Sequence, residues 1–153
     1  RSSDLQRLEA HVTSPKLSPE AQALLGTRGL GELADRMGIE LLELSAERAV
    51  ARMPVEGNRQ PLGYLHGGAY VVIAETLGSI AANVWAYPEK AAVGVEVNAS
   101  HTRSATEGWV TATCTALNLG KSLTLHEIVV TDEQNRRLST VRITNFLKAR
   151  AAQ

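Results

Sequence analysis

The feature that most constrains this chain is a run over residues 67–86 that predicts one long helix with small or apolar side chains on almost every face. Pro88 follows as a natural stop. A helix that is apolar all round is expected to be buried. The chain has 153 residues, 44% of them apolar, which is enough for one domain. We therefore expect the rest of this domain to wrap around the helix.

The segments on either side of the helix have the patterns of β-strands. Short breaks near Glu107-Gly108 and Gly120-Lys121 predict that successive strands are antiparallel neighbours. No strand–helix–strand alternation occurs, so the fold class is α+β, an antiparallel sheet around one central helix. The expected strands are Ile39–Leu44 and Arg48–Val55, joined by Ser45-Ala46-Glu47, then Ala92–Arg103, Trp109–Leu119, Leu123–Thr131 and Leu138–Leu147.

The first third of the chain predicts short helices rather than sheet. Ser3 is placed to cap a helix over Asp4–His11, and Ser18-Pro19-Glu20 has the cap, proline and first-turn acid of a helix over Pro19–Leu25. A third piece, Glu32–Met37, stops at Gly38. We expect a helical arm over residues 1–37 and the main domain over 38–150.

Composition excludes several function classes. Sixteen Lys and Arg balance sixteen Asp and Glu, so no overall positive charge favours nucleic acid or an anionic membrane. The single cysteine, Cys114, excludes an intramolecular disulfide framework and a cysteine-rich zinc site. The four histidines are scattered and predict no metal site. No apolar run has the length of a membrane span, and the N-terminus shows no signal peptide, so we expect a cytoplasmic protein.

Two features of the long helix suggest a functional site. It opens with His66-Gly67-Gly68, where free N–H groups and the helix dipole favour negative charge. Glu75 interrupts the apolar sequence and forms a polar stripe with Ser79 and Asn83. Taken singly, the glycines could be a flexible helix start and Glu75 an ion-paired structural residue. Gly67 and Glu75 are roughly 12 Å apart along the axis, so both could reach one carbonyl only if a two-fold partner laid its helix antiparallel alongside.

The runs Met53–Val55, Gln60–Ser79 and Val93–Ala105 resemble the hotdog-fold acyl-CoA thioesterases, and most closely the 1,4-dihydroxy-2-naphthoyl-CoA hydrolases. The resemblance implies that the helix is wrapped by the sheet and that subunits form dimers, usually paired again into tetramers. It also implies catalytic roles: Glu75 as nucleophile or general base, and the Gly67 N–H of the partner subunit as oxyanion donor. Supporting roles fall on His66, Gln60 and Ser79.

For the substrate, the resemblance implies acyl-CoA binding through three parts of the chain. We expect Arg103 and Lys121 to flank one sheet end, where their charges suit the phosphates of CoA. The reaction needs no metal or other cofactor, because a thioester is already activated. The implied binding residues are Gly94, then His101, Arg103 and Ser104, then Asn118, Gly120, Lys121 and Ser122.

Two other functions stay open at this point. A hydratase or dehydratase of acyl thioesters on the same fold would place its histidine beside a Phe-Pro-Gly-type turn, and the loop Leu62–His66 lacks one. A non-catalytic acyl-CoA-binding module would need no carboxylate at Glu75. Release of free thiol from acyl-CoA distinguishes hydrolysis from both.

Overall fold

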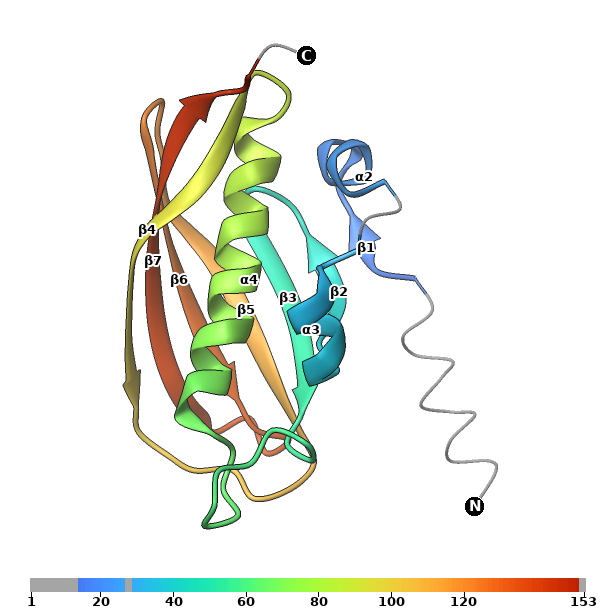
Figure 1. The fold of residues 1–153 in the computed structure, drawn as a ribbon, viewed down its shortest axis with the longest axis vertical. Coiled ribbons are helices and arrows are strands. Elements are labelled where there is room, and N and C mark those ends of the chain that lie inside the picture. The colour runs from blue at the N-terminus through green and yellow to red at the C-terminus, as the bar shows by residue number, and fades with distance from the viewer. Residues whose placement is uncertain (1–13, 27–28, 152–153) are drawn as a thin grey trace.

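The computed structural model describes residues 14–26 and 29–151, and shows one long helix lying against a curved sheet (Figure 1). The helix, α4 (Gly67–Ala86), has the bounds expected from the sequence. The expected helix over Asp4–His11 lies outside the described residues. The two short helices of the arm, α2 (Pro19–Leu25) and α3 (Glu32–Met37), are confirmed, and Ser18 caps α2 by accepting a hydrogen bond from the N–H of Ala21.

The sheet has seven strands in the order β1-β2-β3-β5-β6-β7-β4. All neighbours are antiparallel except β1, which lies parallel to β2 and adds a short piece of the arm to one edge. The strands are β1 (Lys16–Leu17), β2 (Glu40–Leu44), β3 (Arg48–Pro54), β4 (Lys90–His101), β5 (Trp109–Leu119), β6 (Leu123–Thr131) and β7 (Arg137–Ala149).

The expectation that β4 and β5 are neighbours is wrong. β4 returns from the helix along the far edge of the sheet and pairs with β7, while β5 pairs with β3 and β6. Three strand spacings, about 14 Å, separate β4 from β5. The seven linking residues can span about 23 Å, so a short break does not require adjacent strands. This link passes the helix start, where the Leu65 N–H donates to the Ala105 carbonyl at 2.8 Å.

The helix is buried on one side only, which corrects a second expectation. Ile73, Leu77 and Ala81 face the sheet and are fully buried, whereas Glu75 is exposed within the single chain. Among the described residues α4 alone is long and apolar enough to cross a bilayer, yet 56% of its apolar window is buried inside the fold. The helix therefore acts as the core of this domain, with one face left for other uses.

Gly78 lets the helix approach the sheet closely. A Cβ built on Gly78 would lie 2.2 Å from Cγ2 of Ile143 on β7, far inside van der Waals contact. The backbone of α4 therefore rests directly on a β7 side chain. This contact sets the distance between the two layers.

Gly78→Ala should lower the free energy of unfolding by about 1–3 kcal/mol through overpacking, although alanine favours a helix by about 1 kcal/mol over glycine. The matched test is a double-mutant cycle with Ile143→Ala, which removes the clashing methyl group. In the Ile143→Ala background, Gly78→Ala should leave the free energy of unfolding almost unchanged or raise it. Urea denaturation at fixed protein concentration measures the free energy of unfolding of all four proteins. A higher free energy of unfolding for Gly78→Ala in the wild-type background would contradict this packing.

Candidate active site

The start of α4 keeps one backbone donor free. His66 is the N-cap residue, and its Nδ1 accepts a hydrogen bond from the Gly68 N–H at 2.8 Å. The Ala69 N–H donates to the His66 carbonyl at 2.9 Å. Within the part of the chain that the structure describes, no group accepts from the Gly67 N–H. That N–H, at the positive end of the helix dipole, is available to a bound oxygen.

A polar cavity of about 370 Å³ adjoins this helix start. It brings together five of the residues expected from the sequence, contributed by the loop before α4, by the helix itself and by the segment after β4: Gln60, Gly67, His101, Arg103 and Ser104. The Gln60 side chain is folded back onto its own loop, where its Oε1 accepts from the Leu62 N–H. Arg103 is exposed, so this cavity has a cation available for an anionic ligand.

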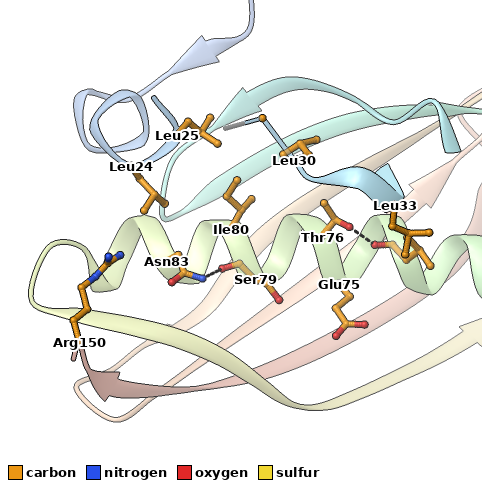
Figure 2. Close-up of a pocket in the computed structure, with 12 residues that line it drawn as sticks. Leu24, Leu25, Leu30, Leu33, Glu75, Thr76, Ser79, Ile80, Asn83 and Arg150 are labelled. Carbon is orange, nitrogen blue, oxygen red and sulfur yellow. Dashed lines mark hydrogen bonds between the residues drawn. The ribbon is translucent and has the colours of Figure 1, made fainter. Parts of the chain in front are cut away.

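Glu75 lies two turns further along α4 and lines a different, larger cavity of about 590 Å³ (Figure 2). Ser79 and Asn83 line the same cavity, and Asn83 donates to the Ser79 carbonyl at 2.9 Å. The ion pairs formed by the described residues do not include Glu75. The expectation of a buried carboxylate is thus wrong for one chain; Glu75 is exposed and unpaired at the wall of a cavity.

Gly94 on β4 leaves space beside the carboxylate. A Cβ on Gly94 would lie 3.7 Å from Glu75 Oε1, and both residues line a small cavity of about 220 Å³. Glu75 therefore stands between β4 on one side and the large cavity on the other. Gly94 lies beside the carboxylate and not in the polar cavity with His101 and Arg103.

The opposite wall of the large cavity comes from the arm and was not identified from the sequence. It consists of leucines from α2, from the segment before α3 and from α3 itself, which line the cavity together with Ile80 and Val72 of α4: Leu24, Leu25, Leu30 and Leu33. Arg150 closes one end (Figure 2). The sequence shows these leucines, but they have no regular spacing and are equally typical of ordinary packing.

The turn 118–122 lies far from the other implied binding residues of the same chain. It lies at the C-terminal end of α4, where Trp85 Nε1 donates to the Gly120 carbonyl at 2.8 Å and Lys90 Nζ donates to the Lys121 carbonyl at 2.7 Å. The eleven residues of β5 span roughly 33 Å between this turn and the link that holds Arg103. Arg103 and Lys121 of one chain therefore lie at opposite ends of the sheet, contrary to expectation.

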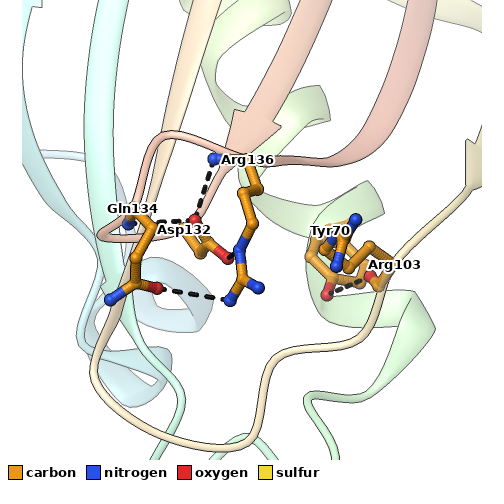
Figure 3. Close-up of polar contacts among 5 residues, drawn as sticks. All are labelled: Tyr70, Arg103, Asp132, Gln134 and Arg136. Carbon is orange, nitrogen blue, oxygen red and sulfur yellow. Dashed lines mark hydrogen bonds and ion pairs between the residues drawn. The ribbon is translucent and has the colours of Figure 1, made fainter.

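Two titrating groups near the polar cavity have shifted pKa values (Figure 3). Burial, with a smaller effect of the Asp132 charge, raises the pKa of Tyr70, so its hydroxyl stays protonated and donates to the Arg103 carbonyl at 3.5 Å. Desolvation opposes ionisation of Asp132, but hydrogen bonds from Arg136 outweigh it and hold the pKa of that carboxyl below its usual range. Both groups stabilise the loops around the cavity.

Cys114 and the acidic groups offer no second reactive centre. Burial raises the pKa of the Cys114 thiol to about 12, so this cysteine stays protonated and unreactive. Across residues 14–26 and 29–151, no three His, Cys, Asp or Glu side chains come close enough to hold a metal ion. The groups available for the chemistry include Glu75 in one cavity, and the Gly67 N–H with His101 and Arg103 in the other.

A family model described as the thioesterase superfamily matches residues 62–139, about half of the chain and all of α4. The chain belongs to the thioesterase superfamily. The matched residues include Gly67, Glu75 and the whole of β4, β5 and β6. The sheet around one central helix agrees with the hotdog fold expected from the resemblance.

Individual relatives support the same assignment. A 1,4-dihydroxy-2-naphthoyl-CoA hydrolase of Listeria monocytogenes is 41% identical over 117 residues, covering 76% of this chain and 95% of that protein. The proofreading thioesterase EntH of Cronobacter turicensis is 40% identical over 121 residues, covering 78% and 88%. This thioesterase is therefore an enzyme that hydrolyses acyl-CoA thioesters.

Solved structures share the fold. A Staphylococcus aureus thioesterase, solved as a variant with a glutamine replaced by alanine, is 31% identical with a TM-score of 0.72, covering 76% of this chain and 98% of that one. A second variant of the same protein, with a glutamate replaced by alanine, gives 30% identity and a TM-score of 0.74, covering 78% and 100%.

Loss of the His66 cap should weaken the helix start. His66→Ala removes the acceptor for the Gly68 N–H and should lower the free energy of unfolding by about 1 kcal/mol. His66→Asn keeps a capping acceptor and should stay within a few tenths of a kcal/mol of wild type. Urea denaturation compares the three proteins; equal losses for both variants would show that the cap is not what His66 contributes.

Proposed function

We propose that this thioesterase hydrolyses an aromatic acyl-CoA, such as 1,4-dihydroxy-2-naphthoyl-CoA, with Glu75 as nucleophile or general base. The observation that carries the proposal is an exposed carboxylate, without an ion pair among the described residues, on the wall of a cavity of about 590 Å³ that four leucines of the arm also line. Such a cavity has the size of a small-ligand site, and its leucine walls suit an acyl group rather than a charged one. The hydrolase from Listeria monocytogenes, named for the naphthoyl substrate, supports the aromatic class.

The chemistry requires a base or nucleophile and an oxyanion donor. As general base, Glu75 takes a proton from water while the water oxygen bonds to the thioester carbon. As nucleophile, its oxygen attacks that carbon first and water then hydrolyses the anhydride. In both routes the C–S bond breaks, the thiolate of CoA leaves, and the acid remains. The developing oxyanion accepts a hydrogen bond from a Gly67 N–H. Ser79, one turn from Glu75, helps to place the water, and the route uses no metal or other cofactor.

Gln60 has an independent argument for a role near Glu75. In the Staphylococcus aureus thioesterase, the glutamine and glutamate replaced in the two solved variants are fifteen positions apart, the separation of Gln60 from Glu75 here. We assign Gln60 and His66 to the oxyanion end of the site, where they support the loop and helix start that present the Gly67 N–H.

Two subunits must contribute to each site, because Gly67 and Glu75 of one chain are roughly 12 Å apart along a rigid helix and line separate cavities. β4 offers the surface for pairing, since it is a twelve-residue edge strand with β7 as its one neighbour in the sheet described. Val95 on this edge is 59% exposed. A long apolar edge of this kind favours pairing with another copy.

We infer further that the dimers pair into tetramers. Val93, Phe146 and Leu123 lie in register across β4, β7 and β6 and are all exposed large apolar side chains. Pairing through β4 would also bring the turn 118–122 of one subunit and the Arg103 segment of another to the same side of the assembly, so that Asn118, Gly120, Lys121 and Ser122 complete the CoA site.

Glu75→Gln should lower kcat for release of CoA thiol about 10³-fold or more, because it removes the base or nucleophile and keeps the side-chain shape. Glu89→Gln, an exposed carboxylate near the end of α4, is the matched control and should stay within twofold. Thiol release is followed with a panel of acyl-CoA substrates. Hydration of a 2-enoyl-CoA without thiol release would overturn hydrolysis, and a tenfold higher kcat/KM for a medium-chain aliphatic substrate would overturn the aromatic class.

Gly67→Pro tests the oxyanion donor and the sharing of sites together. Proline is tolerated at the first helical position but lacks the N–H, whereas Gly67→Ala keeps the N–H and adds a comparable Cβ. The proline variant should have kcat about 10²–10³-fold below that of the alanine variant.

Mixing subunits of Gly67→Pro and Glu75→Gln, each nearly inactive alone, should restore about a quarter of wild-type activity, since half of the dimers are mixed and each carries one intact site. Activity after dissociation and reassociation of the two purified proteins is the measurement. No recovery in verified mixed dimers would mean that each site belongs to one chain.

A further inference from the structure

The imidazole of His101 is held on three sides where β4 meets the start of α4. Its ring centroid lies 5.0 Å from that of Tyr70. A Cβ on Gly67 would lie 3.2 Å from its Nε2, so only glycine leaves the ring this much room. On the third side, its Nδ1 lies 2.8 Å from the Oγ of Ser139. An exposed histidine normally samples several rotamers, and these contacts restrict it to one orientation.

Ser139 determines which ring nitrogen carries the proton. It is fully buried on β7, directly opposite His101 in the sheet register. Its hydroxyl donates to the Ser100 carbonyl at 3.3 Å, and a carbonyl oxygen can only accept. With the single hydroxyl proton directed to this carbonyl, the hydroxyl oxygen is the acceptor for His101 Nδ1–H. In the neutral ring Nε2 then carries a lone pair and no proton.

The free lone pair of Nε2 is placed next to the cavity at the helix start. The cavity thus presents a backbone donor, the Gly67 N–H, and an acceptor, Nε2, side by side. In a CoA thioester the phosphates offer only acceptors, while the pantetheine arm carries two amide N–H groups and a hydroxyl. An unprotonated Nε2 matches the arm and not the phosphates, for which Arg103 in the same cavity is suited.

We propose that Ser139 is a positioning residue: it holds His101 with its proton on Nδ1, so that Nε2 accepts a hydrogen bond from the pantetheine arm of the substrate. This inference rests on the proposed CoA-thioester substrate. The family resemblance implies His101 only as a CoA-binding residue, and this inference assigns it to the part of CoA next to the reacting carbonyl.

The tautomer is measured directly by two-bond ¹H–¹⁵N correlation spectra of the imidazole nitrogens, with the His101 signals assigned by their loss in His101→Gln. In the free wild-type enzyme, Nδ1 should be the protonated nitrogen of neutral His101. Ser139→Ala should shift the proton to Nε2, the usual form in water. Ser139→Thr, which keeps the hydroxyl, should retain Nδ1–H, and Thr140→Ala, a neighbouring β7 hydroxyl that does not contact His101, is the matched control.

Kinetics distinguish the part of CoA that His101 contacts. Ser139→Ala should raise KM about five- to tenfold for both acyl-CoA and the corresponding acyl-pantetheine, with kcat within twofold of wild type, and Ser139→Thr should restore KM. A KM effect confined to acyl-CoA would place His101 at the nucleotide, whose adenine amino group and ribose hydroxyl are also donors, and would overturn the proposal. An Nε2–H tautomer in the wild-type enzyme, or an unchanged tautomer in Ser139→Ala, would also overturn it. Absence of thioester hydrolysis by the wild-type enzyme would instead refute the proposed function, and the spectra would still report on the tautomer.

Discussion

The close approach of α4 to the sheet at Gly78 and Ile143 determines the geometry of everything else in this thioesterase. It fixes both the depth and the rotation of the helix, because the face that carries Gly78 and Leu77 must point inward. The outward side of the helix then carries Glu75 and Ser79, and the Glu75 carboxylate points away from the leucines of the arm, towards β4 (Figure 2). This outer side is mixed: Val72 and Ile80 lie beside the polar stripe of Glu75, Ser79 and Asn83.

In the proposed function, the start and the middle of the helix have different chemical roles. The start supplies hydrogen-bond donors and a cation for the polar part of a ligand, and the middle supplies a carboxylate beside apolar walls. Zero net charge over the whole chain does not exclude a polyanionic ligand, because Arg103 and the Gly67 N–H act locally. His66 illustrates how the end is tuned: its ring satisfies the Gly68 N–H and leaves the neighbouring donor free.

The helices and strands could be predicted from the sequence, but the order of the strands in the sheet could not. The bounds of α4, β5 and β6 follow from patterns over neighbouring residues, such as the alternation of Thr with Val, Ala and Cys in β5. The place of β4 in the sheet depends on pairing with β7, some fifty residues later in the chain, and no local pattern encodes it. The same limit explains why Arg103 and Lys121 were wrongly expected at one end of the sheet. Placing them correctly requires the direction of every strand between them.

The site shows the same division. Gln60, Gly67 and His101 were identified by their residue types and their resemblance to a family, and the structure brings them to one cavity. Glu75 was identified too, but its burial was misjudged because helical periodicity does not reveal which face a sheet will cover. The leucines of the arm and the role of Ser139 could not be found from the sequence, since a leucine or a strand serine is informative only once its neighbours in space are known.

The large apolar cavity and the polar cavity have no lining residue in common, and this separation bears on how such enzymes diverge. Under the proposed function, substitutions among Leu24, Leu30 and Leu33 reshape the space for the acyl group without touching the loop and strand ends that meet the other cavity. Selection for a different acyl group can therefore change one part of the chain, while the residues that recognise CoA stay the same. Relatives about 40% identical to this chain, with names that refer to different tasks, are what such independent evolution of two half-sites would produce.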